Sequence, residues 1–164
     1  MQIIKLNAID STNHYLADLV SKIPLKDYAV VVAQYQSAGR GQRGSNWQSE
    51  KGKNLIISIL KKNIEIKVQD QFEINMRVSM AILMALKTFE IPNLSVKWPN
   101  DILSDNKKIS GVLIQLLTKK QKINQAITGI GINVNQTHFN NLPQATSMKS
   151  IWVQLLILRY WLRN

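Results

Sequence analysis

Four of the seven glycines and four basic residues fall within one polar stretch, residues 37–53. These residues are Gly39, Gly41, Gly44, Gly52, Arg40, Arg43, Lys51 and Lys53. Glycine lets a backbone approach a ligand closely and point its N–H groups at an anion. Arginine adds planar pairs of donors that suit phosphate and carboxylate groups. This stretch, called the glycine loop (residues 37–53), is therefore predicted to bind an anion.

The spacing of these glycines fits two known phosphate-binding patterns only in part. Gly39, Gly41 and Gly44 satisfy G-x-G-x-x-G, but the residues that follow predict a strand where the dinucleotide fingerprint needs a helix. The P-loop pattern fails because Ser45 stands where its lysine belongs. The loop is therefore predicted to join two strands. Trp47 adds a flat face on which an adenine ring could lie, with an ordinary core tryptophan as an equal alternative.

Two further segments contain residues that could take part in chemistry. Residues 97–102 place a cation, an aromatic ring, a rigid turn and a carboxylate side by side, as Lys97, Trp98, Pro99, Asn100 and Asp101. Lys108 precedes an apolar run containing Gly111, where its charge needs a partner unless it is only a hairpin charge. Residues 129–134 predict a strand interrupted by two glycines, which often mark a close approach of backbone or ligand.

The rest of the composition excludes several kinds of site. The chain has no cysteine, which excludes disulfides, thiol nucleophiles and cysteine-bound zinc. Its ten carboxylates are scattered and its histidines, His14 and His138, are isolated, so neither a catalytic triad nor a metal site made by side chains alone is predicted. The formal net charge of +11 favours a polyanionic partner such as nucleic acid, a nucleotide or an acidic protein. A lysine-rich solvated surface is the alternative.

Length and hydropathy indicate one soluble domain. The chain has 164 residues, 45% of them apolar, which is enough for a single buried core. Residues 1–20 lack the basic start and apolar centre of a signal peptide. The longest apolar run, near residues 151–158, is far shorter than a bilayer span. We therefore expect a cytoplasmic protein without a membrane partner.

The elements that must position these residues begin as alternating strands and helices. Strands are predicted over residues 3–6, 29–34 and 55–60, and a helix over residues 13–21 after the capping run 10–13. A second helix is predicted to open with a capping box of Asp70 and Glu73 and to end before Pro92. One face of that helix is expected to carry Phe72, Met76, Ser79, Leu83 and Leu86.

After the second helix the pattern changes to strands without helical crossovers. They are predicted over residues 95–98, 102–103, 109–117 and 125–134, with tight turns at Pro99-Asn100 and Asp105-Asn106. A doubly wound fold would need helices between these strands, and there is no room for them. We therefore expect an α+β fold in which a mixed or antiparallel sheet carries helices on one side.

Taken together, these segments resemble the catalytic domain of the biotin protein ligase family, in order and in spacing, over roughly residues 9–147. The matching pieces are Ser11-Thr12-Asn13, Gln36, residues 39–44, Trp47, Asn54-Leu55, and residues 97–102, 107–111 and 129–134. The resemblance implies a mixed sheet related to that of class II aminoacyl-tRNA synthetases. Each piece is a weak signal by itself, and the ordered set is specific.

The resemblance also implies a two-step reaction. The carboxylate of biotin attacks the α-phosphate of ATP, which gives biotinyl-5′-AMP and pyrophosphate. The acyl group then passes to a lysine of a biotin carboxyl carrier protein, such as that of acetyl-CoA carboxylase or a related carboxylase. Mg²⁺ is expected with ATP, held largely by phosphates and water because carboxylates are few.

The family's catalytic roles carry over to five matching residues. Arg40, Gly41 and Lys108 would hold the biotin carboxylate and the α-phosphate, because fixed charge and oriented N–H donors stabilise the joining of two anions. Lys97 and Asp101 would lie near the reacting acyl group or the incoming lysine.

The remaining ligand-binding residues implied by the resemblance form three sets. The ureido ring of biotin would be bound by Ser11, Thr12 and Gln36. The adenine would be framed by Trp47, Asn100 and Asn133. The binding set is completed by Asn13, Gly39, Gln42, Arg43 and Gly111.

The chain departs from the family's pattern at two places. Gln42 stands where many members have arginine, so retention of the adenylate is expected to depend on Arg43 or to be looser. Residues 1–150 would form the catalytic domain, incomplete at its C-terminus, followed by a divergent apolar tail over residues 151–164. The tail needs burial against the core or in a homodimer. No helix-turn-helix precedes residue 1, so DNA binding is not expected.

Three alternatives remain open. A lipoate or octanoate protein ligase shares the implied fold, although the glycine loop with Trp47 and residues 97–101 favour biotin. A nucleic-acid-binding module would explain the charge, but aromatic residues are not interleaved with basic ones on the predicted strands. A shortened relative that only binds biotin is the third.

Overall fold

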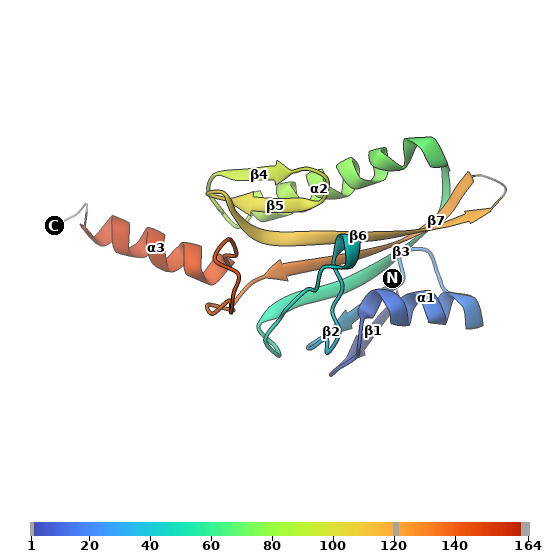
Figure 1. Ribbon diagram of the computed structural model, residues 1–164, viewed down its shortest axis with the longest axis horizontal. Helices are drawn as coiled ribbons and strands as arrows, with labels where there is room; N and C mark the ends of the chain where they lie inside the picture. Colours follow the sequence, from blue (N-terminus) through green and yellow to red (C-terminus); the bar gives the residue numbers. More distant parts are fainter. Residues whose placement is uncertain (1, 120–121, 162–164) are drawn as a thin grey trace.

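The computed structural model describes residues 2–119 and 122–161 and contains one mixed sheet with helices on both faces (Figure 1). In chain order the elements are β1 (Ile3–Leu6), α1 (Thr12–Lys22), β2 (Val30–Ala33), η1 (Gln42–Gly44), β3 (Asn54–Lys67), η2 (Val68–Asp70), α2 (Gln71–Lys87), β4 (Leu94–Lys97), β5 (Asp101–Ser104), β6 (Lys107–Lys119), β7 (Lys122–Asn133) and α3 (Met148–Trp161). The strand order in the sheet is β1-β2-β3-β7-β6-β5-β4.

Strand pairing makes the sheet mixed, as the sequence predicts. β1 runs parallel to β2, and the pairs that follow, from β2–β3 to β6–β7, are antiparallel. The long strands β3, β7 and β6 form its centre. β3 extends past its predicted end at residue 60 because Lys61 and Lys62 continue the ladder with β7 before a register shift between Lys62 and Ile66.

The period of two in these strands divides apolar residues between two cores. On one face, Leu16 of α1 packs in a cluster with Leu60 of β3 and Ile127 of β7. On the other face, Leu86 of α2 packs with Ile109 and neighbouring residues of the sheet. Complete burial of each such leucine or isoleucine contributes about 1.5–3 kcal/mol.

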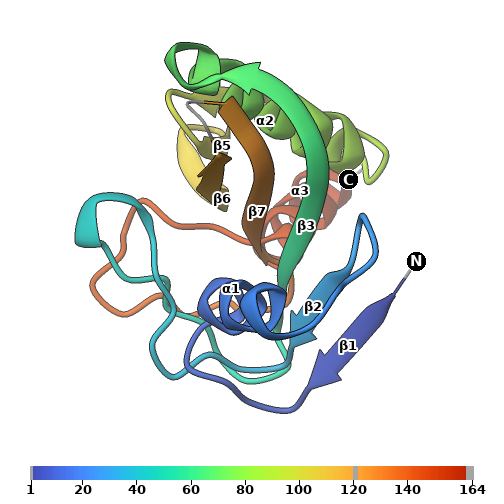
Figure 2. The same cartoon turned by 90° about the vertical axis from the view of Figure 1, so that its right-hand side faces the viewer.

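The helices therefore differ from the one-sided arrangement expected from the sequence. The expectation holds for α2 and the start of α3, where Met148 and Ile151 join the α2 cluster. The helix α1 packs on the opposite face, and Figure 2 shows strands lying between α1 and α2. The α+β class is confirmed; α1 precedes β2 and packs on one face, whereas α2 follows β3 and packs on the other.

The predicted start of α2 is wrong in detail. Asp70 makes no side-chain capping hydrogen bond, so the capping box with Glu73 does not form. The one-turn η2 leads directly into the helix instead. The predicted apolar face is correct for Ser79, Leu83 and Leu86, which are buried, whereas Phe72 and Met76 are 43% and 49% exposed. The buried stripe passes instead through Ile74 and Ile82.

The other local predictions agree with the structure. Ser11 caps α1 by accepting a hydrogen bond from the His14 N–H at 3.4 Å. Asp105 and Asn106 both have positive φ, at 47° and 63°, in the tight turn between β5 and β6. The helix α3 extends beyond one end of the sheet (Figure 1). Among the described residues, no helix is both long and apolar enough to span a bilayer.

Candidate functional site

A cavity of about 330 Å³ lies where the glycine loop and the start of α1 meet strands β3, β6 and β7. Most residues predicted to form the site line it. They are Ser11, Thr12, Asn13, Gln36, Arg40, Gly41, Gln42, Trp47, Asn100, Asp101, Lys108 and Gly111. Segments a hundred residues apart in the chain, such as those of Ser11 and Gly111, thus come together at one cavity; its binding of an anion stays a prediction.

Three other predicted residues, Gly39, Lys97 and Asn133, do not line the cavity, and Arg43 is described only in its backbone. Gly39 is buried within the loop, where its carbonyl accepts from the Trp47 N–H, and Lys97 is exposed at the end of β4. Asn133 is buried at the end of β7, where its Nδ2 donates to the Thr146 carbonyl at 3.0 Å. The backbone of Arg43 lies in η1, and its side chain is outside the described part of the structure. The adenine role of Asn133 and the acyl-group role of Lys97 remain predictions.

The glycine loop folds back on itself as a narrow hairpin. The Trp47 N–H donates to the Gly39 carbonyl at 2.9 Å, and the Gly41 N–H donates to the Ser45 carbonyl at 2.7 Å. A side chain on Gly39 would bring its Cβ to 2.5 Å from the Trp47 carbonyl oxygen, so glycine is required there. The turn at the tip is closed by Gly44 with a φ of +79°. The predicted strand–loop–strand element is therefore confirmed.

One end of the cavity is polar and uncharged. The Gln36 Oε1 accepts hydrogen bonds from the Thr12 N–H at 2.8 Å and from Thr12 Oγ1 at 3.0 Å. The Ser58 hydroxyl lies 2.8 Å from Thr12 Oγ1 and 2.6 Å from Asn13 Oδ1. Asn13 in turn donates through Nδ2 to the Leu113 carbonyl at 3.1 Å. These contacts fix the orientation of the side chains that face the cavity.

Ser58 is fully buried and was not among the predicted site residues. Its signal in the sequence is a single hydroxyl in the middle of the apolar run 55–60. A hydroxyl has one proton, so Ser58 can donate to only one of its two partners at a time. It therefore supports the polar end from behind the cavity wall.

The carboxyl group next to this polar end is held in its charged form. Asp10 accepts a hydrogen bond from the Ser11 N–H at 2.6 Å, which lowers the pKa of the Asp10 carboxyl below its ordinary value. The neighbouring His14, whose Nδ1 is 3.2 Å from Asp10 Oδ2, lowers this pKa further. Asp10 does not line the cavity.

The opposite end of the cavity carries charge. Arg40 is exposed at its rim, and Lys108 Nζ forms an ion pair with Asp101 Oδ1 at 2.7 Å. The same Nζ lies 5.6 Å from the centre of a Trp47 ring, within range of a cation–π contact. Lys108 is thus more than a hairpin charge, because its ammonium group has two partners at the cavity.

The floor between these ends is made by glycine. Gly111 and Gly131 are directly opposite each other on β6 and β7, and the Trp47 ring lies against both. A Cβ on Gly111 would come within 3.1 Å of Lys108 Nζ and of the Trp47 ring, and a Cβ on Gly131 would overlap that ring. The glycine-interrupted strand therefore marks a close approach, as predicted, here of Trp47.

Other lining residues were not predicted as site residues. They are Ser45, Ile56, Ile57, Trp98, Pro99, Val112, Leu113, Gly129, Ile130 and Gly131. Half of them are aliphatic strand residues, whose types do not distinguish a cavity wall from a core. Asn100 lines the cavity but its Nδ2 is engaged with the Val112 carbonyl at 2.6 Å, so it also braces β6.

The donor set does not favour a metal ion held by the protein. Among the described residues, no group of three or more histidine, cysteine, aspartate or glutamate side chains could hold one. Asp101 supplies the single carboxylate of the described cavity lining and is already paired with Lys108. The arrangement suits an elongated ligand with an uncharged polar ring at one end and an anionic group at the other.

Comparison with known proteins gives a family and several relatives. The model of the Biotin/lipoate A/B protein ligase family matches residues 6–133. The chain is 36% identical over 131 residues to the bifunctional ligase/repressor BirA of Escherichia coli, which covers 79% of this chain and 39% of that protein. The chain thus spans about two fifths of the length of this curated relative.

Solved structures agree on the fold. Biotin protein ligase from Aquifex aeolicus in complex with biotin and ATP superimposes with a TM-score of 0.67 and 31% identity, covering 95% of this chain and 67% of that one. Protein Ta0514 from T. acidophilum, described as a candidate lipoate protein ligase, superimposes with a TM-score of 0.59 at 11% identity, covering 91% of this chain and 77% of that one. The second likeness concerns the fold alone.

Proposed function

The chain belongs to the Biotin/lipoate A/B protein ligase family, and from this premise we propose that it is an ATP-dependent biotin protein ligase. The observation that carries the proposal is the pairing, in one cavity, of an uncharged hydrogen-bonding end with a cationic end. Relatives support biotin as the substrate, since the Aquifex aeolicus enzyme of similar fold binds biotin and ATP.

The uncharged end suits the ureido ring of biotin, which is neutral and both donates and accepts hydrogen bonds. Ser11, Thr12 and Gln36 would face the ring, and Asn13 would be held beside them by Ser58. The polar end has neutral hydrogen-bonding groups and does not attract the biotin carboxylate. The ureido ring would therefore lie at the polar end and the carboxylate at the cationic end. Its valeryl chain would then run over the glycine floor toward Lys108.

The cationic end suits the reaction of two anions. An oxygen of the biotin carboxylate attacks the α-phosphorus of ATP, and the bond from this phosphorus to the bridging oxygen of the β-phosphate breaks, which releases pyrophosphate. Arg40, the Gly41 backbone and Lys108 would hold the carboxylate and the α-phosphate. Their charge and N–H groups lower the repulsion between the reactants and stabilise the charge of the transition state.

In the second step the amine of an acceptor lysine attacks the acyl carbon of biotinyl-5′-AMP and AMP leaves. Asp101 would lie beside this acyl group, and its ion pair with Lys108 keeps both side chains oriented. Lys97 is assigned to the same step from the family pattern, although it is exposed at the end of β4. Trp47 would support the adenine with Asn100, and Gln42 with Arg43 would close over the adenylate.

Mg²⁺ would enter with ATP. Because Asp101 is the one carboxylate of the described lining and is engaged by Lys108, the residues fit an ion held by phosphate oxygens and water. When bound, the ion would neutralise the phosphates of ATP, while the side chains of the cavity hold biotin in place.

The acceptor we propose is a biotin carboxyl carrier protein of acetyl-CoA carboxylase or a related carboxylase. Residues 1–150 would form the catalytic domain, followed by an apolar tail over residues 151–164 that begins with Ile151 buried in the α2 cluster. We also propose a homodimer in which the tail contacts the second subunit. The lipoate or octanoate alternative is disfavoured, because the lipoate-type neighbour shares the fold at only 11% identity. Nucleic-acid binding has the net charge in its favour and no further observation.

The test is biotin-dependent exchange of labelled pyrophosphate into ATP, since it follows the first step without an acceptor protein. Lys108→Met removes the ammonium group at the cavity and should lower exchange by about 10²-fold or more. Lys107→Met is the matched control, because the adjacent Lys107 is exposed and does not line the cavity. Absence of exchange in the wild-type chain, or equal loss in both variants, would overturn the proposal.

A further inference from the structure

The segment that follows β7, called the return segment (residues 134–147), lies beyond the part of the chain that matches the family model, which ends at residue 133. It leaves the end of β7, forms a loop and returns to β6 before α3 begins. Figure 2 shows this segment, in orange, passing beside the glycine loop, in teal. It contacts both sides of the cavity without lining it.

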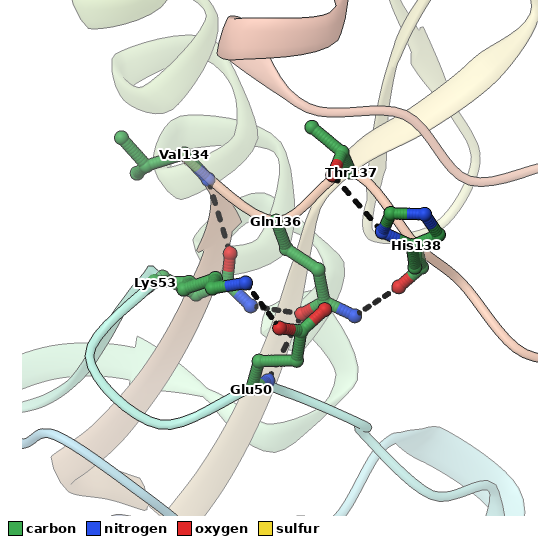
Figure 3. Close-up of polar contacts among 7 residues, drawn as sticks. Glu50, Lys53, Val134, Gln136, Thr137 and His138 are labelled. Atoms are coloured by element: carbon green, nitrogen blue, oxygen red, sulfur yellow. Dashed lines mark hydrogen bonds and ion pairs between the residues drawn. The ribbon is translucent and has the colours of Figure 1, made fainter.

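The centre of its contact with the glycine loop is the amide of Gln136, whose residue is only 5% exposed (Figure 3). The Gln136 Oε1 accepts hydrogen bonds from the Glu50 N–H at 3.0 Å and from Asn54 Nδ2 at 2.6 Å. The Gln136 Nε2 donates to the His138 carbonyl at 2.8 Å. Both lone pairs of the carbonyl and one N–H are therefore used.

Further contacts hold the same end of the glycine loop. The Asn135 N–H donates to the Lys53 carbonyl at 2.7 Å, and the Val134 N–H donates to Asn54 Oδ1 at 3.2 Å. Lys53 Nζ forms an exposed ion pair with Glu50 Oε2 at 2.5 Å. Asn54 thus holds the return segment to the start of β3 with both polar atoms of its side-chain amide.

The other end of the return segment holds the backbone of Lys108. The Lys108 N–H donates to the Gln144 carbonyl at 2.6 Å, and the Thr146 N–H donates to the Lys108 carbonyl at 2.9 Å. Asn133 donates to the Thr146 carbonyl at 3.0 Å, which fixes this strand-like piece in place. The lysine at the cationic end of the cavity is therefore held from outside by the return segment.

We propose that Gln136 is a positioning residue: through the return segment it holds the C-terminal end of the glycine loop in register with Lys108. The effect of Gln136 on catalysis rests on the proposed function. Its effect on the position of the loop rests on the contacts alone. The side chain touches neither the cavity nor its contents, so it acts through the loop.

Both ends of the glycine loop have backbone hydrogen bonds, and the C-terminal end is also held by a side chain, that of Gln136, which a single substitution can remove. At the N-terminal end, Ser37 and Ala38 donate backbone hydrogen bonds to the Ile9 and Asp10 carbonyls. These bonds do not depend on side chains. At the C-terminal end the Gly52 N–H and the Lys53 carbonyl also have backbone partners, whereas the Glu50 N–H has a side-chain acceptor, so loss of the Gln136 amide leaves a half-buried donor unsatisfied. The loop should then open from that end.

The test is tryptic cleavage of the ligand-free protein, with fragments followed by mass. The loop offers four cleavage sites, Arg40, Arg43, Lys51 and Lys53. Gln136→Leu removes both functions of the amide and should raise the cleavage rate in the loop about tenfold. Gln144→Leu is the matched control, because that side chain is exposed in the same segment, and it should cleave at the wild-type rate.

Conservative replacement and kinetics separate positioning from general loss of structure. Gln136→Glu keeps the acceptors for Glu50 and Asn54 and loses the donor to His138. Its rate of loop cleavage should therefore lie between those of Gln136→Leu and the wild type. In pyrophosphate exchange, Gln136→Leu should raise the KM for ATP about five- to tenfold while changing kcat about twofold. A merely destabilising change would lower the active fraction and leave KM unaltered.

A second variant covers failure of Gln136→Leu to fold. Asn54→Asp removes the donor to Gln136 and keeps the acceptor for the Val134 N–H, so the loop should again cleave about tenfold faster. A folded variant of either residue that cleaves at the wild-type rate would overturn the inference. Cleavage is measured without ligand, so it tests the structural role of Gln136 independently of activity. Absence of pyrophosphate exchange in the wild-type chain would reject the proposed function and would leave the cleavage result valid.

Discussion

Replacement of Ser58 by alanine is the most direct probe of how the polar end of the cavity is built. The Ser58 hydroxyl is fully buried in β3, 2.6 Å from Asn13 Oδ1 and 2.8 Å from Thr12 Oγ1. The change removes one oxygen and one proton and leaves the strand's apolar contacts in place. Asn13 Oδ1 then loses the donor that it has in the described structure. The amide cannot turn over to compensate, because its Nδ2 donates to the Leu113 carbonyl.

The expected effect has two parts. A buried acceptor left unsatisfied costs about 1–3 kcal/mol, so the free energy of unfolding should fall by that amount. In a domain of this size each kcal/mol lowers Tm by about 2–4 °C. Thr12 and Asn13 also lose a fixed orientation in the free protein, so the cost of ordering their side chains is added to the free energy of biotin binding. A cost of about 1 kcal/mol should raise the Kd for biotin about fivefold.

The assay combines thermal unfolding with calorimetric titration of biotin. Ser104→Ala is the control, because Ser104 is also buried and donates to the Pro92 carbonyl at 2.8 Å, remote from the cavity lining. It should lower Tm by a similar amount and leave the Kd for biotin unchanged. Should Ser58→Ala bind biotin as tightly as Ser104→Ala does, the argument that Ser58 orients the polar end would be refuted.

Two other predictions concern the loop and the pH dependence of stability. Arg40→Ala should lower adenylate formation in the exchange assay far more than Gln42→Ala, because a guanidinium group at the rim carries charge toward the phosphates; equal losses would contradict the ranking. The hydrogen bond from Lys61 Nζ at 2.5 Å, with a further one from the Lys62 N–H, lowers the pKa of Asp27 below its ordinary value of 3.8. The lowered pKa of Asp27 adds stability above pH 3.8, and this stability is lost as the pH falls through the pKa of the folded state. Asp27→Asn should therefore have a lower Tm than the wild type at pH 7 and the same Tm in strong acid. A difference in Tm that is independent of pH would contradict this prediction.

Several features of the chain could be predicted because they depend on few neighbouring residues. A glycine such as Gly44 closes a turn because of its own backbone freedom, and Asp105-Asn106 forms a tight turn for a related reason. The N-cap at Ser11 needs only the next turn of helix. Local predictions of this kind were confirmed in the structure, and the family resemblance was confirmed by the family model that matches residues 6–133.

The apolar face of α2 shows where local reasoning ends. Phe72 and Met76 share a helical spacing with residues that are buried, yet both are exposed. The apolar residues of α2 are spread over more than one side of the helix, so which of them are buried depends on where the sheet lies against it, and Ile74 and Ile82 are the ones buried there. The hydrophobic periodicity predicts that a helix forms here, and it does not predict the rotation of the helix about its own axis against the sheet.

The amino-acid sequence alone was sufficient for the α+β class and for the strand–loop–strand form of the glycine loop, which depend on residue types at short spacing, and the family resemblance indicated twelve of the residues that line the cavity. The three-dimensional structure alone decided that α1 and α2 lie on opposite faces, that Ser58 supports Thr12 and Asn13, and that Gln136 holds the glycine loop. These contacts join residues between 45 and 86 positions apart. A hydrogen bond at that separation exists because the sheet brings two distant backbones together, and no local pattern records which pairs will meet.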